Sequence, residues 1–117
     1  DLGIDGDFRG KHEKRQVTLL SKEDWENACA DLGVEMPWTT RRANLLTKDI
    51  SFENTKGSHL HIGEIVLQVT GETQPCHRMD EACNGLQDAL TPAWRGGILC
   101  LVVTGGKIQI GDSIHFK

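Results

Sequence analysis

The fold of this chain is decided by the stretch Glu64-Ile65-Val66-Leu67-Gln68-Val69-Thr70. Ile65, Leu67 and Val69 recur at every second position, which is the spacing that places side chains on one face of a β-strand. An amphipathic helix would instead repeat its apolar residues at intervals of three and four. The stretch therefore predicts a strand with one face in a core.

Further strands are predicted on both sides of this stretch. Short runs of β-branched and aliphatic residues, bounded by glycine or turn residues, are typical of strands. They are expected at residues 16–20, 41–46, 59–62, 98–103, 107–110 and 113–116. The last three are expected to form a meander around the Gly111-Asp112 turn, whereas residues 1–15, rich in glycine and charge, predict a loop.

One helix has clear signals at both ends. Ser21 is a good N-cap, and Gly33 is a typical residue at a helix C-terminus. The apolar stripe between them follows the helical spacing: Trp25, Ala28, Cys29 and Leu32. Two shorter helical segments are expected within residues 71–92, after a loop over residues 71–75.

Many short strands with one good helix predict a mainly β fold. We expect a closed or nearly closed β-barrel with a few short helical inserts. The 117 residues suit a single domain over residues 1–117. Because the chain starts within a predicted loop, we expect an N-terminal strand to be missing or disordered.

Composition and charge exclude several classes of function. The net charge of -4 disfavours binding to a nucleic-acid backbone. No apolar run approaches the roughly 20 residues that cross a bilayer, and no signal-peptide pattern is present. We expect a cytoplasmic protein with no membrane partner. Its four cysteines contain no CxxC pair and are therefore expected to be free thiols.

Cys76 differs from the other cysteines in its setting. It follows the predicted loop at 71–75 and precedes a predicted short helix, and Pro75 stiffens its approach. The positive end of the helix dipole, with His77 and Arg78, favours the thiolate, which is both a nucleophile and a soft metal ligand. On this setting alone, a reactive cysteine and an ordinary loop cysteine are equally good interpretations.

Arg42 and Asn44 lie two apart on the predicted strand 41–46 and so share a face. A guanidinium beside an amide offers donors suited to a phosphate or to the edge of a heterocycle. A solvated polar face is the alternative, and the residues alone favour it.

A basic cluster follows the glycine-rich start of the chain: Lys11, His12, Lys14 and Arg15. It could receive an anion. Charge runs of this length are usually solvated, which is the simpler interpretation.

His59 and His61 also share a strand face, as two metal ligands would. Zinc needs further ligands, and Cys76, His77 or Cys83 could supply them only at an unrecognised spacing. Exposed strand histidines are the preferred interpretation.

Several segments together resemble the MOSC domain, named after the C-terminal part of molybdenum cofactor sulfurases. In order, they are Gly3-Ile4-Asp5-Gly6-Asp7, Arg15-Gln16-Val17, Arg42-Ala43-Asn44-Leu45-Leu46, Ile62-Gly63 with Leu67-Gln68-Val69-Thr70 leading to Pro75-Cys76, Arg95-Gly96-Gly97 and Ile110-Gly111-Asp112. The likeness runs from Gly3 to Phe116. It implies a MOSC-type β-barrel whose first strand would precede residue 1, with an unpaired edge that a homodimer would cover.

The resemblance also implies a site for the molybdenum cofactor (molybdopterin). Cys76 would be the molybdenum thiolate ligand or a persulfide carrier. Arg42 and Asn44 would hold the pterin phosphate and its surroundings, with Lys11, His12 and Arg15 as weaker candidates.

Three functions stay open at this stage. The first is a cofactor-binding or sulfur-carrier module, with a cysteine desulfurase as partner. The second is a molybdenum-dependent reductase of N-hydroxylated compounds that takes electrons from a separate donor protein. The third is a degenerate barrel that has lost the cofactor.

Overall fold

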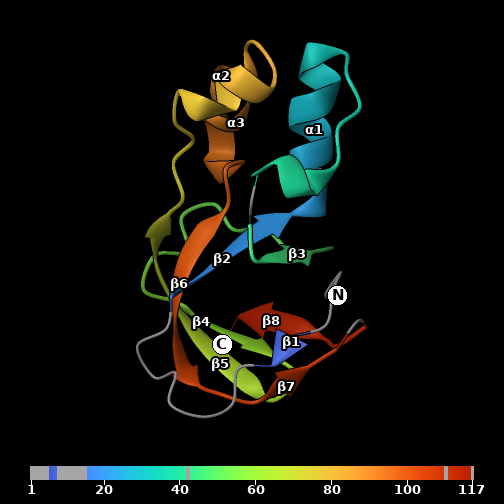
Figure 1. Ribbon diagram of the computed structural model, residues 1–117. Coiled ribbons are helices and arrows are strands. Elements are labelled where there is room, and N and C mark those ends of the chain that lie inside the picture. Colours follow the sequence, from blue (N-terminus) through green and yellow to red (C-terminus); the bar gives the residue numbers. More distant parts are fainter. Residues whose placement is uncertain (1–5, 8–15, 42, 110, 117) are drawn as a thin grey trace.

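The computed structural model describes residues 6–7, 16–41, 43–109 and 111–116. Its helices gather at one end of a curled sheet, and the short strands β1 (Gly6–Asp7) and β7 (Lys107–Ile108) lie at the other end (Figure 1). The helical end is where β2 (Gln16–Ser21) runs directly into the first helix and where β5 (Ile65–Glu72) ends. Cys76 therefore lies at the junction of sheet and helices.

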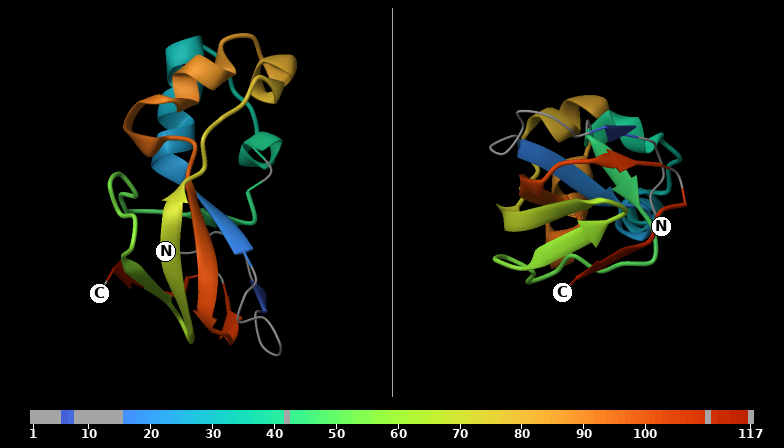
Figure 2. Two further views of the ribbon diagram at one scale, coloured as in Figure 1. Left: turned by 90° about the vertical axis from the view of Figure 1, so that its left-hand side faces the viewer. Right: turned by 90° about the horizontal axis from the view of Figure 1, so that it is seen from below.

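Six strands form the main sheet, in the order β3-β2-β6-β5-β4-β8. The remaining strands of this sheet are β3 (Leu45–Thr47), β4 (His59–Ile62), β6 (Ile98–Thr104) and β8 (Ile114–Phe116). Among the strand pairs of the described residues, β2–β3 is parallel and the others are antiparallel. The sheet curls into a half-barrel (Figure 2), which confirms the mainly β fold with helical inserts.

The predicted period-2 pattern of β5 is confirmed. Ile65, Leu67 and Val69 are all buried, and they join the inner faces of the neighbouring strands in one core. Phe52, from the segment between β3 and β4, is fully buried in the same core. The concave side of the half-barrel is thus filled by side chains rather than open.

A second core lies between the sheet and the helices. Neighbouring residues of β2 serve the two cores, because successive side chains of a strand point to opposite faces. Leu19 belongs to the first core and Leu20 to the second. Leu20 packs there with buried residues of all three helices: Trp25, Ala28, Cys29, Met79, Leu86, Ala89 and Leu90.

Helix α1 (Lys22–Leu32) has the caps that the sequence predicts. The Ser21 hydroxyl accepts a hydrogen bond from the Asp24 amide at 3.3 Å. Gly33 ends the helix with a φ of 68°, a left-handed conformation that glycine adopts without the Cβ penalty. The two expected shorter segments are α2 (Arg78–Ala82) and α3 (Leu86–Leu90), followed by a 3₁₀ turn, η2 (Pro92–Trp94).

Three local predictions are wrong. Residues 41–46 are not one strand, because a 3₁₀ turn, η1 (Trp38–Arg41), precedes the shorter β3. The final strands are not a meander, since β8 pairs with β4 and β7 (Lys107–Ile108) pairs with β1 (Gly6–Asp7). Strand β1 also lies within the predicted loop 1–15. These pairings join segments far apart in the chain, which local turn signals do not reveal.

Over the described residues, the structure holds no helix that is both long and apolar enough to span a bilayer.

Candidate functional site

Cys76 lies in the segment that links β5 to α2. Its carbonyl oxygen accepts a hydrogen bond from the Met79 amide at 2.9 Å, and His77 is the residue before the first turn of α2. The thiol is therefore close to the start of a helix, as predicted. Because α2 has only five residues, its dipole is a weak source of charge.

The four cysteines are free and differ in exposure. Cys76 is exposed and Cys83 is half-buried, whereas Cys29 and Cys100 are buried. Burial raises the pKa of the Cys29 thiol, and it raises that of Cys100 to about 12. Since the thiolate is the reactive form, neither buried cysteine is suited to nucleophilic or metal-binding chemistry.

Cys76 opens onto a cavity of about 820 Å³. The cavity is lined by Thr39, Thr40, Arg41, Cys76, Arg78, Met79, Glu81 and Ala82. Two guanidinium groups, two hydroxyl groups and one carboxylate thus surround the thiol. This donor set favours an anionic ligand with several oxygen atoms.

Arg41 connects this cavity to the rest of the fold. Its Nη2 donates to the Thr73 carbonyl at 2.9 Å, and its Nε donates to the Gly96 carbonyl at 3.2 Å. Its Nη1 lies 4.0 Å from the sulfur of Met79. The guanidinium therefore holds together η1, the segment before Cys76 and the turn that leads into β6.

A Cys76 thiolate acts electrostatically on Arg41. Burial lowers the pKa of Arg41, and the negative charge of a Cys76 thiolate opposes that shift. A cation in a half-buried position normally needs an anionic partner. In the described part of the chain, no carboxylate lies within ion-pair distance of Arg41.

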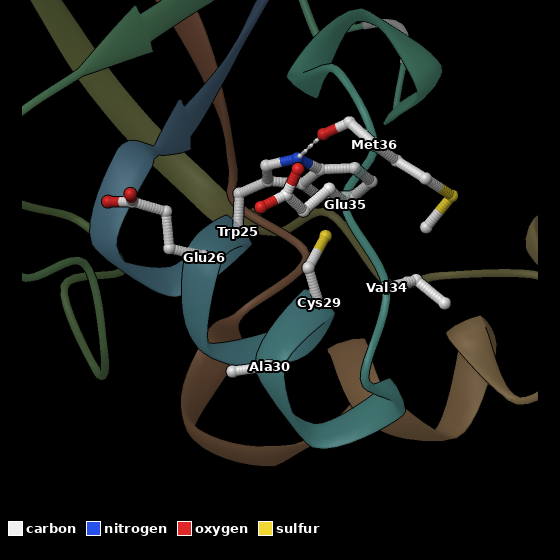
Figure 3. Close-up of a pocket in the computed structure, with 7 residues that line it drawn as sticks. All are labelled: Trp25, Glu26, Cys29, Ala30, Val34, Glu35 and Met36. Atoms are coloured by element: carbon white, nitrogen blue, oxygen red, sulfur yellow. Dashed lines mark hydrogen bonds between the residues drawn. The ribbon is translucent and has the colours of Figure 1, made fainter.

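A second cavity, of about 440 Å³, lies between α1 and the segment at residues 34–36 (Figure 3). Cys29 points into it beside the Trp25 ring, whose Nε1 donates to the Met36 carbonyl at 2.9 Å. Among the described residues, the charged side chains that line it are Glu26 and Glu35, with no cation. With a buried thiol and no cation beside it, this cavity is a poorer candidate than the one at Cys76.

Asn44 does not line the Cys76 cavity. Its Oδ1 accepts hydrogen bonds from the Thr18 amide at 2.8 Å and from the Thr18 hydroxyl at 3.1 Å. The structure thus places Asn44 at the start of the β2–β3 pairing. Its expected role in holding a pterin stays a prediction.

The other predicted anion-binding residues lie outside the described residues: Arg42, Lys11, His12 and Arg15.

His59 is exposed and His61 half-buried on β4. The His61 ring stacks on that of His115 across the β4–β8 pair, with ring centroids 5.3 Å apart. Over the described residues, no group of three or more His, Cys, Asp or Glu side chains is arranged to hold a metal ion.

Sequence reasoning missed Arg41, Thr39 and Thr40. Arg78 was noticed beside Cys76, and it does line the same cavity. Thr39 and Thr40 precede the strand expected at residues 41–46, Arg41 is its first residue, and none of the three belongs to a motif of its own. The one available signal was the polar run Thr39-Thr40-Arg41 before an apolar strand, a pattern that many surface turns share.

The sequence matches the MOSC domain over residues 5–115. The chain belongs to the MOSC domain family. A search of curated proteins gives no match.

Solved structures with the same fold as this MOSC domain include YiiM from Geobacillus stearothermophilus, with a TM-score of 0.74 and 16% identity over 91% of this chain. YuaD from Bacillus subtilis has a TM-score of 0.70 and 20% identity over 97% of this chain and 75% of its own. YiiM from Escherichia coli has a TM-score of 0.67 and 14% identity over 100% of this chain and 70% of its own. This MOSC domain spans 55% of the Geobacillus YiiM chain, and at these identities the likeness concerns the fold.

MOSC domains are associated with the molybdenum cofactor, and the residues at Cys76 fit such a group. An exposed thiol is a soft ligand, and guanidinium groups are suited to a phosphate. The Thr73 hydroxyl, shortly before Cys76, is buried with no hydrogen-bond partner among the described residues. A buried hydroxyl left without a partner is costly, so a further polar group beside this segment would be stabilising.

Proposed function

We propose that the cavity at Cys76 binds the molybdenum cofactor or a sulfur destined for it. The observation that carries the proposal is an exposed free thiol in a cavity of about 820 Å³ that Arg41 and Arg78 also line. Family membership supports the same assignment.

Five of the lining residues have a defined task in this proposal. The Cys76 thiolate is the metal ligand, Arg41 and Arg78 bind the phosphate, and the hydroxyl groups of Thr39 and Thr40 donate to its oxygen atoms. When bound, the cofactor supplies a metal centre for redox chemistry, which the protein's side chains cannot provide. The chain's own contribution is to hold and orient the group.

The test is cofactor content. We would purify the protein from a host that makes the cofactor and measure molybdenum and pterin per chain in the wild type and in Cys76→Ser. The proposal predicts near-stoichiometric metal in the wild type and little in the variant. Cys83→Ser, which changes a half-buried thiol outside the cavity, is the matched control and should keep its metal. Absence of metal from every variant would favour a degenerate barrel.

The sulfur-carrier form has a separate test, because the same thiol can accept sulfur. A cysteine desulfurase persulfide would transfer its outer sulfur to the Cys76 thiolate, so that one S–S bond forms, another breaks and the donor leaves as a thiolate. Mass spectrometry after incubation with a desulfurase should show one added sulfur in the wild type and none in Cys76→Ser. Such a reaction would make the desulfurase a partner.

The reductase form is tested only on protein that contains metal. Reduction of a hydroxylamine with a supplied electron donor would support it, since the sequence contains no motif for a flavin or an iron–sulfur centre of its own. An electron-donor partner and a homodimer both stay predictions.

A further inference from the structure

Arg41 does more at this site than line a cavity. Its two carbonyl acceptors belong to Thr73, which precedes Cys76 on the same segment, and to Gly96, which lies beside Pro75 of that segment. Gly96 is buried against the same contacts: a Cβ there would lie 3.3 Å from Nη2 of Arg41 and 3.2 Å from Cδ of Pro75. The Arg41 guanidinium therefore packs against both the segment that leads to Cys76 and the turn at Gly96.

The hydrogen bonds of Arg41 are incomplete. A guanidinium has five N–H donors. Those of Arg41 meet the carbonyls of Thr73 and Gly96, and the sulfur of Met79 at 4.0 Å, which is a weak acceptor. None of these acceptors carries a negative charge. Over the described residues, the cation thus has spare donors and no carboxylate partner.

Two further charged side chains in the same cavity change the electrostatic potential around Arg41. Arg78 is exposed and adds a second cation at its rim, and Glu81 is exposed and opposes both. Cys76 lies among them, and its charge acts on Arg41. An incoming molecule in this cavity therefore meets both the sulfur and a guanidinium that, among the described residues, keeps N–H groups without an acceptor.

We infer that Arg41 selects the partners of Cys76 by charge: it binds the oxygens of an oxyanion (carboxylate, phosphate or sulfonate) while the Cys76 sulfur meets the rest of the same molecule. The planar fork of a guanidinium suits two oxygens of such a group. The inference extends the proposed function, because it names the chemical class that the thiol accepts. It assigns the anion to Arg41, which the sequence motifs did not indicate.

The competing explanation is that Arg41 is only structural. A residue that merely ties Thr73 to Gly96 would change the stability of the loop when replaced. It would not change how the thiol discriminates between charged and neutral reagents. The decisive measurement is therefore one of charge selectivity.

The experiment compares two alkylating agents of similar size, iodoacetate and iodoacetamide. Both form an S–C bond at the thiolate and release iodide, but only iodoacetate carries a carboxylate. Because both react with the same thiolate, the ratio of their rates at Cys76 is independent of how much thiolate is present. The ratio is measured by peptide mass spectrometry on the full chain at low ionic strength.

We expect the iodoacetate-to-iodoacetamide ratio at Cys76 to fall by about threefold or more in Arg41→Met, since a nearby unit charge is only partly screened at a half-buried position. Arg41→Lys, which keeps the charge, should retain most of the ratio. Glu81→Gln should raise it. Added salt should lower it in the wild type.

Two further variants keep the inference falsifiable. Lys107→Gln removes an exposed positive charge in β7, the strand at the end of the fold opposite the helices (Figure 1), and should leave the ratio unchanged. Arg41→Gln, whose amide can still donate to Thr73, replaces Arg41→Met if the latter does not fold. An unchanged ratio in the folded Arg41 variant would overturn the inference, and a ratio that depends on Arg78→Gln alone would assign the charge to Arg78.

This experiment needs no cofactor. Protein from a host that does not make the cofactor has an uncapped thiol, and its selectivity reports on the charged side chains of the cavity without any contribution from a bound cofactor. An unchanged ratio in a protein that still binds metal through Cys76 would refute the role of Arg41, including its contact with the phosphate, and would leave cofactor binding at Cys76 intact. A ratio that depends on Arg41 in a protein that binds no metal would refute cofactor binding and leave the anion site.

Discussion

At Gly96, the missing side chain makes room for the loop that carries Cys76. A Cβ on this residue would clash with the Thr73 carbonyl oxygen and would also crowd Pro75 and Arg41. We predict that Gly96→Ala lowers the free energy of unfolding by about 1–3 kcal/mol, the usual cost of overpacking. Urea unfolding monitored by circular dichroism measures it.

Gly71→Ala is the matched control for this prediction. A Cβ on Gly71 meets no atom within 4 Å, although Gly71 lies in β5, near the same loop. Its replacement should have little effect or be mildly stabilising, because alanine loses less backbone entropy than glycine on folding. Equal effects at both positions would contradict the steric explanation.

At this same scale, the sequence singled out Cys76 and the nearby Arg78 but not Arg41. The thiol was recognisable from a local cue, its place between Pro75 and a predicted helix. Arg41 reaches acceptors that lie 32 and 55 residues away in the chain, so no window of sequence contains the interaction. The contacts of Arg41 therefore follow from the tertiary structure and not from the local sequence.

At the scale of elements, Asn44 joins β3 to β2. Its side-chain oxygen accepts hydrogen bonds from the backbone amide and the hydroxyl of Thr18, and its backbone amide donates to the Thr18 carbonyl at 3.0 Å. We predict that Asn44→Ala lowers the free energy of unfolding by about 1 kcal/mol, because the Thr18 amide loses its acceptor. Chemical denaturation of both proteins checks this.

The control is Asn44→Asp, which keeps the accepting oxygen. It should retain most of the stability of the wild type. If Asn44→Ala matches the wild type, the hydrogen bonds to Thr18 contribute nothing measurable.

The element predictions that failed share one physical cause. Propensity and periodicity indicate which secondary structure a segment prefers. They do not indicate which strand it pairs with, because that depends on closing the long loops between distant segments. Residues 107–116 do contain strands around a turn, yet β7 pairs with β1 and β8 with β4. The curl of the sheet, which brings distant strands together, decided these pairings over the local hairpin.

At the scale of the whole molecule, Cys100 links stability to pH. It is fully buried, and burial raises its pKa from an ordinary value of 9.0 to about 12. The folded state thus keeps a proton that the unfolded chain releases. This contribution to stability is complete below pH 9 and is lost as the pH rises towards 12.

We predict that this thiol lowers the free energy of unfolding by about 1.4 kcal/mol per pH unit across that window. Urea unfolding at a series of alkaline pH values measures the slope. Cys100→Ala should start less stable because it leaves a small cavity, but it should lose stability more slowly with pH. Parallel slopes in the two proteins would mean that Cys100 ionises equally in both states.

The sequence by itself determined the strand at residues 64–70, the capped helix α1, the mainly β class and the setting of Cys76. Each depends on residues within a few positions of one another, so local physics suffices. Only the tertiary structure decided the strand order, the place of Asn44 beside Thr18 and the position of Arg41 next to Cys76. Those depend on which distant segments the two cores pack together, because a contact between them exists only after the intervening chain has folded.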